Sequence, residues 1–416
     1  MALGEPSLWA NVYLMEDKEE IQMGPATLAY LRGSGNHPLF LTWFSFGWTR
    51  AAEVFEKLIS PHAGRLQRIT MININHYHEK PIWEFLMNVM GPLSFPILQD
   101  VEIYSADRRP SPSWSTLHLE APCLRRSKLE TPFILQSTSP SLVVLDQNIP
   151  TRTEGPFDLN PLLDLMDHVS HSLEHLRIGG GSYNVFVSTP DRSKIYFQKL
   201  KSLIIGDCDI LMHHILTPNL THLDVCFSCS SEQVVEMFNG FSAPKLKSIR
   251  FYCVPLLPLL ASHNIPSMFP QLTTIVINKC DDTPAFISLL EPLERKESVL
   301  PQEGLEYQEK PQQVENPFPE LKELEIRAEI DLEMILTSLQ VAIEKRLEAG
   351  INRLQTIRLG EEIVEDANTF KRYLTGQGIR LTELEWWDRT PGLSPPLAFQ
   401  DYFYYKEHNI RYFFSI

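Results

Sequence analysis

The chain has 416 residues, 43% of them hydrophobic, and a formal net charge of −15 at pH 7. The hydrophobic content suffices for a packed core, and the acidic balance argues against nucleic-acid partners. The sequence has no apolar run of about 18 residues and no basic-then-apolar N-terminal signal. Its six cysteines are typical of reduced thiols. We therefore expect a cytoplasmic or nuclear protein without a membrane partner.

The first 60 residues show no clear repeat. Residues 38–44 predict a strand after a turn rich in glycine, serine and asparagine, and residues 53–59 predict a helix that ends before Pro61. We expect residues 1–60 to form an N-terminal cap or first coil.

From residue 66 onward, an aliphatic residue recurs with a second three positions later and a third five positions later. The clearest copies are Leu200, Leu203, Ile205 and Leu272, Ile275, Ile277. This spacing is the signature of a leucine-rich repeat, in which the last three positions form a short strand with one buried face. The other copies begin at Leu66, Leu98, Leu124, Leu142, Leu173, Leu220, Leu246, Leu321, Leu354 and Leu381. The pattern predicts an α/β leucine-rich-repeat solenoid, with a curved parallel sheet on the concave face and helices and loops on the convex face.

Between the strands, three segments carry apolar stripes at helical spacing: 160–170, 230–241 and 328–349. In the last, the stripe comprises Ile335, Leu339, Ala342, Ile343 and Leu347. Seven prolines stand just before first leucines and predict turns into the strands, since proline fixes φ and cannot continue a helix. They are Pro96, Pro122, Pro140, Pro218, Pro244, Pro270 and Pro319.

Composition divides the array. We expect repeats over 61–290 and again over 318–390. The segment 291–317 between them is rich in Glu, Gln, Lys and Pro and predicts an acidic mobile insertion. The aromatic residues of 391–416 predict a C-terminal cap, with a partner-binding patch as the alternative.

Residue patterns that could carry chemistry are weak. Cys226 and Cys229 form a single C-x-x-C without a second ligand pair. His168 and His171 share a helix with two aspartates, which a solvated surface explains. The sequence has no phosphate-binding glycine loop and no nucleophile elbow. We therefore expect no catalytic residue, no cofactor and no metal, and treat an enzyme with an unrecognised site as a remote alternative. Cys208 and Cys280 follow strands and are expected to be buried and structural.

Five short sequence motifs occur in order, at residues 6–12, 34–41, 58–65, 121–124 and 243–246. The ordered set, over nearly the whole chain, resembles the F-box/leucine-rich repeat proteins of mushroom-forming (basidiomycete) fungi. The resemblance implies the substrate-receptor part of an SCF-type (Skp–cullin–F-box) ubiquitin ligase. The helices of the F-box would lie before Pro6, so the box is expected to be missing or truncated. We then expect a Skp-type adaptor as a partner only if an upstream F-box exists. An adaptor-independent scaffold without a ubiquitin role is the alternative.

Alternation along the strands predicts the partner-binding residues, since side chains at the second, fourth and sixth positions after each first leucine point away from the core. We expect an unknown protein partner to bind there, with Arg250 and Tyr252 near the centre. The candidates are Asp100, Glu102, Tyr104, Arg126, Lys128, Glu130, His175, Arg177, His222, Asp224, Arg250 and Tyr252.

Overall fold

The computed structural model describes most of the array. The described residues are 10–15, 25–45, 55–73, 86–105, 115–130, 133–137, 139–148, 157–179, 186–187, 192–206, 209–226, 238, 241–252, 269–278, 280, 283–288, 290–294, 314–315, 318–327, 332–359 and 368–383.

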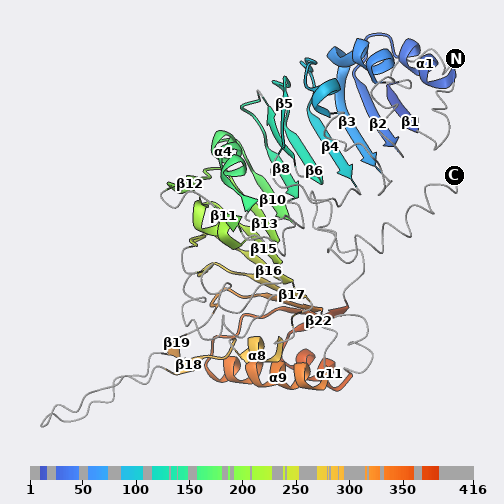
Figure 1. The fold of residues 1–416 in the computed structure, drawn as a ribbon. Coiled ribbons are helices and arrows are strands. Elements are labelled where there is room, and N and C mark those ends of the chain that lie inside the picture. The colour runs from blue at the N-terminus through green and yellow to red at the C-terminus, as the bar shows by residue number, and fades with distance from the viewer. Residues whose placement is uncertain are drawn as a thin grey trace, which may run out of the picture.

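Fourteen strands form one sheet in which every neighbouring pair is parallel and the strands follow chain order. Figure 1 shows the sheet curving from β1 near the N-terminus to β22. The fold is therefore α/β, with the serial order of a solenoid. The strands are β1 (Asn11–Met15), β2 (Leu39–Ser45), β3 (Leu66–Asn73), β4 (Asp100–Ser105), β6 (Arg126–Glu130), β8 (Val144–Asn148), β10 (His175–Gly179), β13 (Ser202–Gly206), β15 (His222–Cys226), β16 (Ser248–Tyr252), β17 (Thr274–Asn278), β20 (Glu323–Arg327), β21 (Thr356–Leu359) and β22 (Arg380–Glu383).

The connections carry helices and short strand pairs. The α-helices are α1 (Pro25–Gly33), α4 (Asn160–Val169), α8 (Thr283–Ser288), α9 (Leu332–Glu348) and α11 (Asn368–Gly376). Two short π-helices are η3 (Phe55–Ile59) and η5 (Leu86–Met90), and two short 3-10 helices are η4 (Ser60–Arg65) and η6 (Asp209–His214). The strand pairs are β5 (Ser115–Leu119) with β7 (Phe133–Ser137), β9 (Phe157–Asp158) with β11 (Phe186–Val187), β12 (Ile195–Tyr196) with β14 (Ile215–Leu216), and β18 (Leu293–Glu294) with β19 (Val314–Glu315). Among the described helices, none is long and apolar enough to cross a membrane.

The strand register confirms the predicted spacing for eleven of the twelve copies. The second core positions of these eleven units are Cα partners from β3 to β21. They are Ile69, Val101, Ser127, Leu145, Leu176, Leu203, Leu223, Ile249, Ile275, Leu324 and Ile357. All are buried, including Ser127.

The copy predicted to begin at Leu381 has the wrong register. Leu381 pairs with Ile357, so it takes the second core position of its unit. The first position falls on Gly378, whose φ of 74° is accessible to glycine. Ile379, one residue later, is buried in its place.

The N-terminal region contributes two full strands to the sheet. Residues 39–45 form β2, as expected, but β1 was not predicted. Val12 and Leu14 of β1 are buried and pair with Leu41 and Trp43 of β2. The ring of Trp43 stacks on Phe55, with centroids 5.9 Å apart. The array therefore begins before residue 60.

Six of the seven predicted proline turns close with a backbone hydrogen bond. The amide of the first leucine donates to the carbonyl of the residue before the proline, as in Leu220 N–H to Thr217 O at 3.1 Å. Proline thus stands at the second position of a β-turn, where its fixed φ is favourable. The same bond closes the turns at Leu98, Leu124, Leu246, Leu272 and Leu321.

Backbone atoms also join each unit to the next. The carbonyl of Lys201, just after a first leucine, accepts hydrogen bonds from the amides of Thr221 (2.9 Å) and His222 (3.0 Å) in the following unit. The carbonyl of Thr221 does the same for Lys247 and Ser248. This linkage repeats along the sheet and fixes the register independently of side chains.

Two of the three predicted helices are described. In α4 the five apolar residues of the stripe are buried. In α9 Ile335, Leu339, Ala342 and Ile343 are buried, but Leu347 is 36% exposed and Arg346 is fully buried. The expectation for Leu347 was wrong. Of the segment 230–241 the structure describes two residues, Phe238 and Phe241, both buried.

The predicted insertion has a structured base. Leu293–Glu294 and Val314–Glu315 pair in an antiparallel ladder, so the two ends of the segment lie side by side. Figure 1 places β18 and β19 beside α8, at the end of the array that also holds α9 and α11. The expected aromatic cap at 391–416 lies outside the described residues.

Candidate functional site

The sheet has a second face that does not belong to the core. Strands alternate buried and partly exposed side chains, as in the pattern of β10, β15 and β16. We call the side that carries Glu102, Arg177 and Arg250 the open face. Helices such as α4 pack on the opposite side, since their apolar residues join the same core cluster as Leu176 and Ile178.

The register places all twelve predicted positions on the open face. They fall in three rows that run across the strands. The first row contains Asp100, Arg126, His175 and His222, the second Glu102, Lys128, Arg177, Asp224 and Arg250, and the third Tyr104, Glu130 and Tyr252. The side chain of Glu130 lies outside the described part.

Six side chains from five neighbouring strands form a continuous network, which we call the charged ladder. It comprises Arg68, Glu102, Tyr104, Lys128, Asp146 and Arg177. The guanidinium of Arg68 donates to Glu102 at 2.8 Å, and the hydroxyl of Tyr104 donates to the same carboxylate at 3.2 Å. Lys128 Nζ lies 4.9 Å from the centre of the Tyr104 ring.

Asp146 completes the charged ladder by forming ion pairs with two cations. It lies 3.9 Å from Lys128 and 3.1 Å from Arg177, and all three side chains are less than one-fifth exposed. Pairs this sheltered are screened less by salt than fully exposed ones. The hydrogen bond from Arg68 to Glu102 raises the pKa of Arg68. The charged ladder therefore links its six side chains through direct contacts across five strands.

Arg68 and Asp146 were not among the predicted residues. Arg68 is the second residue after Leu66, and Asp146 is the fourth after Leu142. The alternation rule that selected the other positions would have found both, had it been applied to these two units.

A separate ion pair lies further along the second row. Arg250 and Asp224 approach to 3.5 Å, each about one-quarter exposed. The neighbours of this pair in the row are Ile204 on one side and Val276 on the other. Burial raises the pKa of Asp224, and the charge of Arg250 opposes that rise. Here the open face is more apolar than at the charged ladder.

Two histidines flank Ser202 in the first row. His175 is partly buried, and this burial lowers its pKa. His222 is exposed, and its Nδ1 lies 2.8 Å from the hydroxyl oxygen of Thr221. Among the residues that the structure describes, no group of three His, Cys, Asp or Glu side chains is placed to hold a metal ion.

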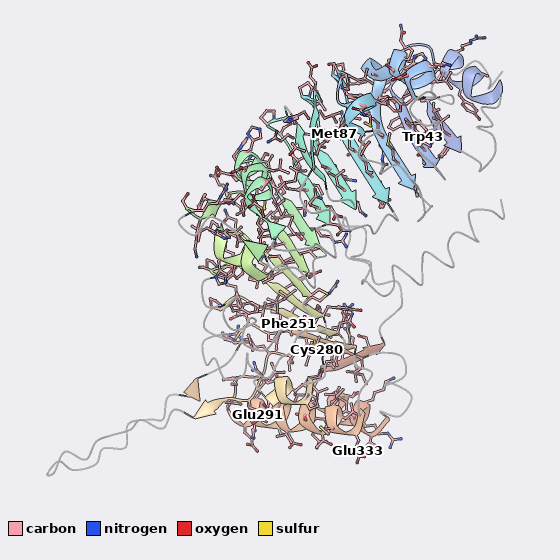
Figure 2. All side chains as sticks on the ribbon, in the orientation of Figure 1. Trp43, Met87, Phe251, Cys280, Glu291 and Glu333 are labelled. Carbon is pink, nitrogen blue, oxygen red and sulfur yellow. The ribbon has the colours of Figure 1, made fainter. Side chains whose placement is uncertain are left out.

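The remaining polar candidates have structural explanations where they are described. The expected pairing of His168 and His171 on one helix was wrong, since α4 ends at Val169, and Asp164 of α4 is exposed and pairs with Arg192 at 2.9 Å. Cys280 is buried, as predicted, and its thiol lies 3.4 Å from the carbonyl oxygen of Asn278. Cys226 is partly exposed at the end of β15. Cys208 and Cys229 lie outside the described residues. Figure 2 shows Cys280 close to the end of the array that holds α9.

The comparisons with known proteins assign no family. No family model matches the chain, and no curated protein matches it significantly. Among solved structures, a crystal structure of a Bacteroides fragilis protein is similar, with a TM-score of 0.34 and 14% identity, over 85% of this chain and 76% of that chain.

Proposed function

We propose that the chain is a leucine-rich-repeat solenoid whose open face binds another protein. The observation that carries this proposal is the charged ladder. Its polar side chains come from five adjacent strands and hold one another in place on a face that the core does not use. A surface already ordered before binding loses less conformational entropy when a partner arrives.

The region around β16 supplies the second support. Arg250 and Tyr252 stand next to each other on the open face, and both residue types are enriched among the residues that dominate binding energy in interfaces. Ile204, which is partly exposed, adds apolar area beside the Asp224–Arg250 pair. Polar anchors beside apolar area are typical of a protein-interaction surface.

Affinity capture with matched variants tests this proposal. The wild-type chain and the double variant Arg250→Ala/Tyr252→Ala serve as baits, and partners are quantified by mass spectrometry. Lys245→Ala is the control, because Lys245 is exposed in the preceding turn, where it bonds Asn219 at 2.7 Å. We expect partners that the control retains and the double variant loses. Identical partner sets for all three baits would contradict the proposal.

The particular role that we propose is the substrate-receptor part of an SCF-type ubiquitin ligase. It is supported by the ordered set of five sequence motifs, from residues 6–12 to residues 243–246, which resembles F-box/leucine-rich repeat proteins. A fusion with an N-terminal F-box is expected to bind a Skp-type adaptor and to direct ubiquitylation of the captured partner. Capture without ubiquitylation by the fusion would favour a scaffold.

A further inference from the structure

The open face has a charge balance unlike that of the whole chain. Among its described side chains there are seven cations and six carboxylates, a formal balance of +1, whereas the chain as a whole carries −15. The cations are Arg68, Arg126, Lys128, Arg177, Arg250, Arg358 and Arg380, and the carboxylates are Asp100, Glu102, Asp146, Asp224, Glu323 and Glu325. The acidic excess of the chain therefore lies elsewhere.

The part of the open face from β3 to β10 is neutral although the chain as a whole is acidic. Its strand positions carry four cations and four carboxylates, Glu130 included. Both carboxylates of the charged ladder are engaged twice, Glu102 by Arg68 and Tyr104, and Asp146 by Lys128 and Arg177. They have little capacity left for a cation from a partner.

Arg126 and Arg68, by contrast, keep donors available. An arginine side chain has five N–H donors. Arg126 has one ion pair among the described residues, with Asp100 at 3.8 Å, and its side chain is 48% exposed. The side chain of Arg68 is 41% exposed although it bonds Glu102. Guanidinium groups held by a neighbouring carboxylate, with an edge facing solvent, suit two-point recognition of another carboxylate.

We propose that the part of the open face from β3 to β10 binds an acidic peptide segment of the partner, with Arg126 and Arg68 as its anchors. This inference rests on the proposed function and specifies the chemistry of the partner. The surrounding negative charge of the chain limits binding to segments short enough to stay on the open face. A nucleic acid, with charge along its whole length, would extend into that repulsion.

Fluorescence anisotropy with three labelled peptides of equal length tests the proposal on the full chain. One peptide is rich in Glu, one carries Lys at the same positions and one carries Gln. We expect the Glu peptide to bind, the other two to bind at least about tenfold more weakly, and the affinity for the Glu peptide to fall as salt rises. Equal or tighter binding of the Lys peptide would overturn the proposal, and so would tighter binding of single-stranded oligothymidine.

A matched pair of variants locates the site. Arg126→Gln is expected to weaken binding of the Glu peptide by about tenfold or more, since it removes a charge-assisted hydrogen bond. Arg353→Gln is the control, because Arg353 is similarly exposed and also pairs with a carboxylate of the preceding unit, Glu320, but lies in the turn before β21. Equal effects of the two variants would refute the assignment. If the Glu peptide fails to bind while Arg250→Ala/Tyr252→Ala still loses partners, this inference falls and the proposed function stands.

Discussion

The guanidinium of Arg346 lies 2.9 Å from the carbonyl oxygen of Leu290, which precedes it in the sequence by 56 residues. Its other terminal nitrogen lies 3.3 Å from the carbonyl oxygen of Phe318. Leu290 and Phe318 bracket the predicted insertion 291–317, so one buried side chain of α9 holds both of its ends. Phe318 has a φ of 53°, a left-handed conformation that a residue with a side chain rarely adopts.

Removal of this guanidinium is expected to destabilise the fold. Burial lowers the pKa of Arg346 to about 10, so the side chain stays protonated at neutral pH. Arg346→Met keeps much of the volume but leaves two buried carbonyl groups without their charged donor. We expect the free energy of unfolding to fall by about 2–4 kcal/mol in urea titrations.

Lys345 provides the adjacent control. Its ammonium pairs with Glu291 near the protein surface. Exposed ion pairs contribute about 0–1 kcal/mol, so Lys345→Met should change stability little. An effect of Arg346→Met no larger than that of Lys345→Met would show that Arg346 does not hold the segment ends.

The segment between β18 and β19 is expected to be dispensable for folding. Glu294 and Val314 are partners in an antiparallel ladder, a geometry that a two-residue Asn-Gly turn can close. Replacement of residues 295–313 by Asn-Gly should not lower the free energy of unfolding, and the shorter loop should raise it by up to about 2 kcal/mol because its closure costs less entropy. Limited proteolysis of the wild type should cut this segment first and leave the flanking parts associated. A large loss of stability would mean that the segment packs on the array.

Thiol reactivity should separate the described cysteines by burial. Cys280 is fully buried and Cys123 is exposed in a proline turn. In the native protein, a maleimide followed by peptide mass spectrometry should label Cys123 rapidly and Cys280 slowly. Both should react rapidly in denaturant. Native labelling of Cys280 at the rate of Cys123 would contradict the burial of Cys280 just after the end of β17.

Stability should decrease in mild acid. Burial lowers the pKa of His175 and of His214 below the ordinary value of 6.5. These two histidines therefore bind protons more readily in the unfolded chain than in the folded one. The stability that their neutral forms contribute is complete above pH 6.5 and is lost as the pH falls through the folded-state pKa values. The urea midpoint should be lower at about pH 5.5 than at about pH 7.5. His214→Gln should reduce that difference. A midpoint that rises in acid would contradict this assignment.

The sheet could be predicted from the sequence because its core positions are spaced regularly. Leu200, Leu203 and Ile205 define a register that Leu220, Leu223 and Val225 repeat, and the strands pair accordingly. The exceptions have local causes. At β22 a glycine replaces the first leucine, so the next leucine was assigned to the wrong position. At β1 the alternating pattern consists of Val12 and Leu14 alone, which is too short to predict a strand.

The end of α9 shows what periodicity cannot decide. Arg346 and Leu347 both lie near the apolar stripe, and hydrophobicity alone favours burial of the leucine. Arg346 is buried instead, because it bonds the carbonyls of Leu290 and Phe318. These two residues are distant from α9 in the sequence, so periodicity within the helix does not reveal them. The sharing of Asp146 by Lys128 and Arg177 likewise depends on which strands are neighbours.

The backbone linkage between units has a consequence for how such a chain can change over evolutionary time. The carbonyls that each accept two amides belong to residues as different as Arg125, Val143, Glu174, Lys201 and Thr273. Since the joint is made of main-chain atoms, substitution at these places leaves it intact. Mutational drift can therefore rewrite much of the solvent-facing composition while the architecture persists.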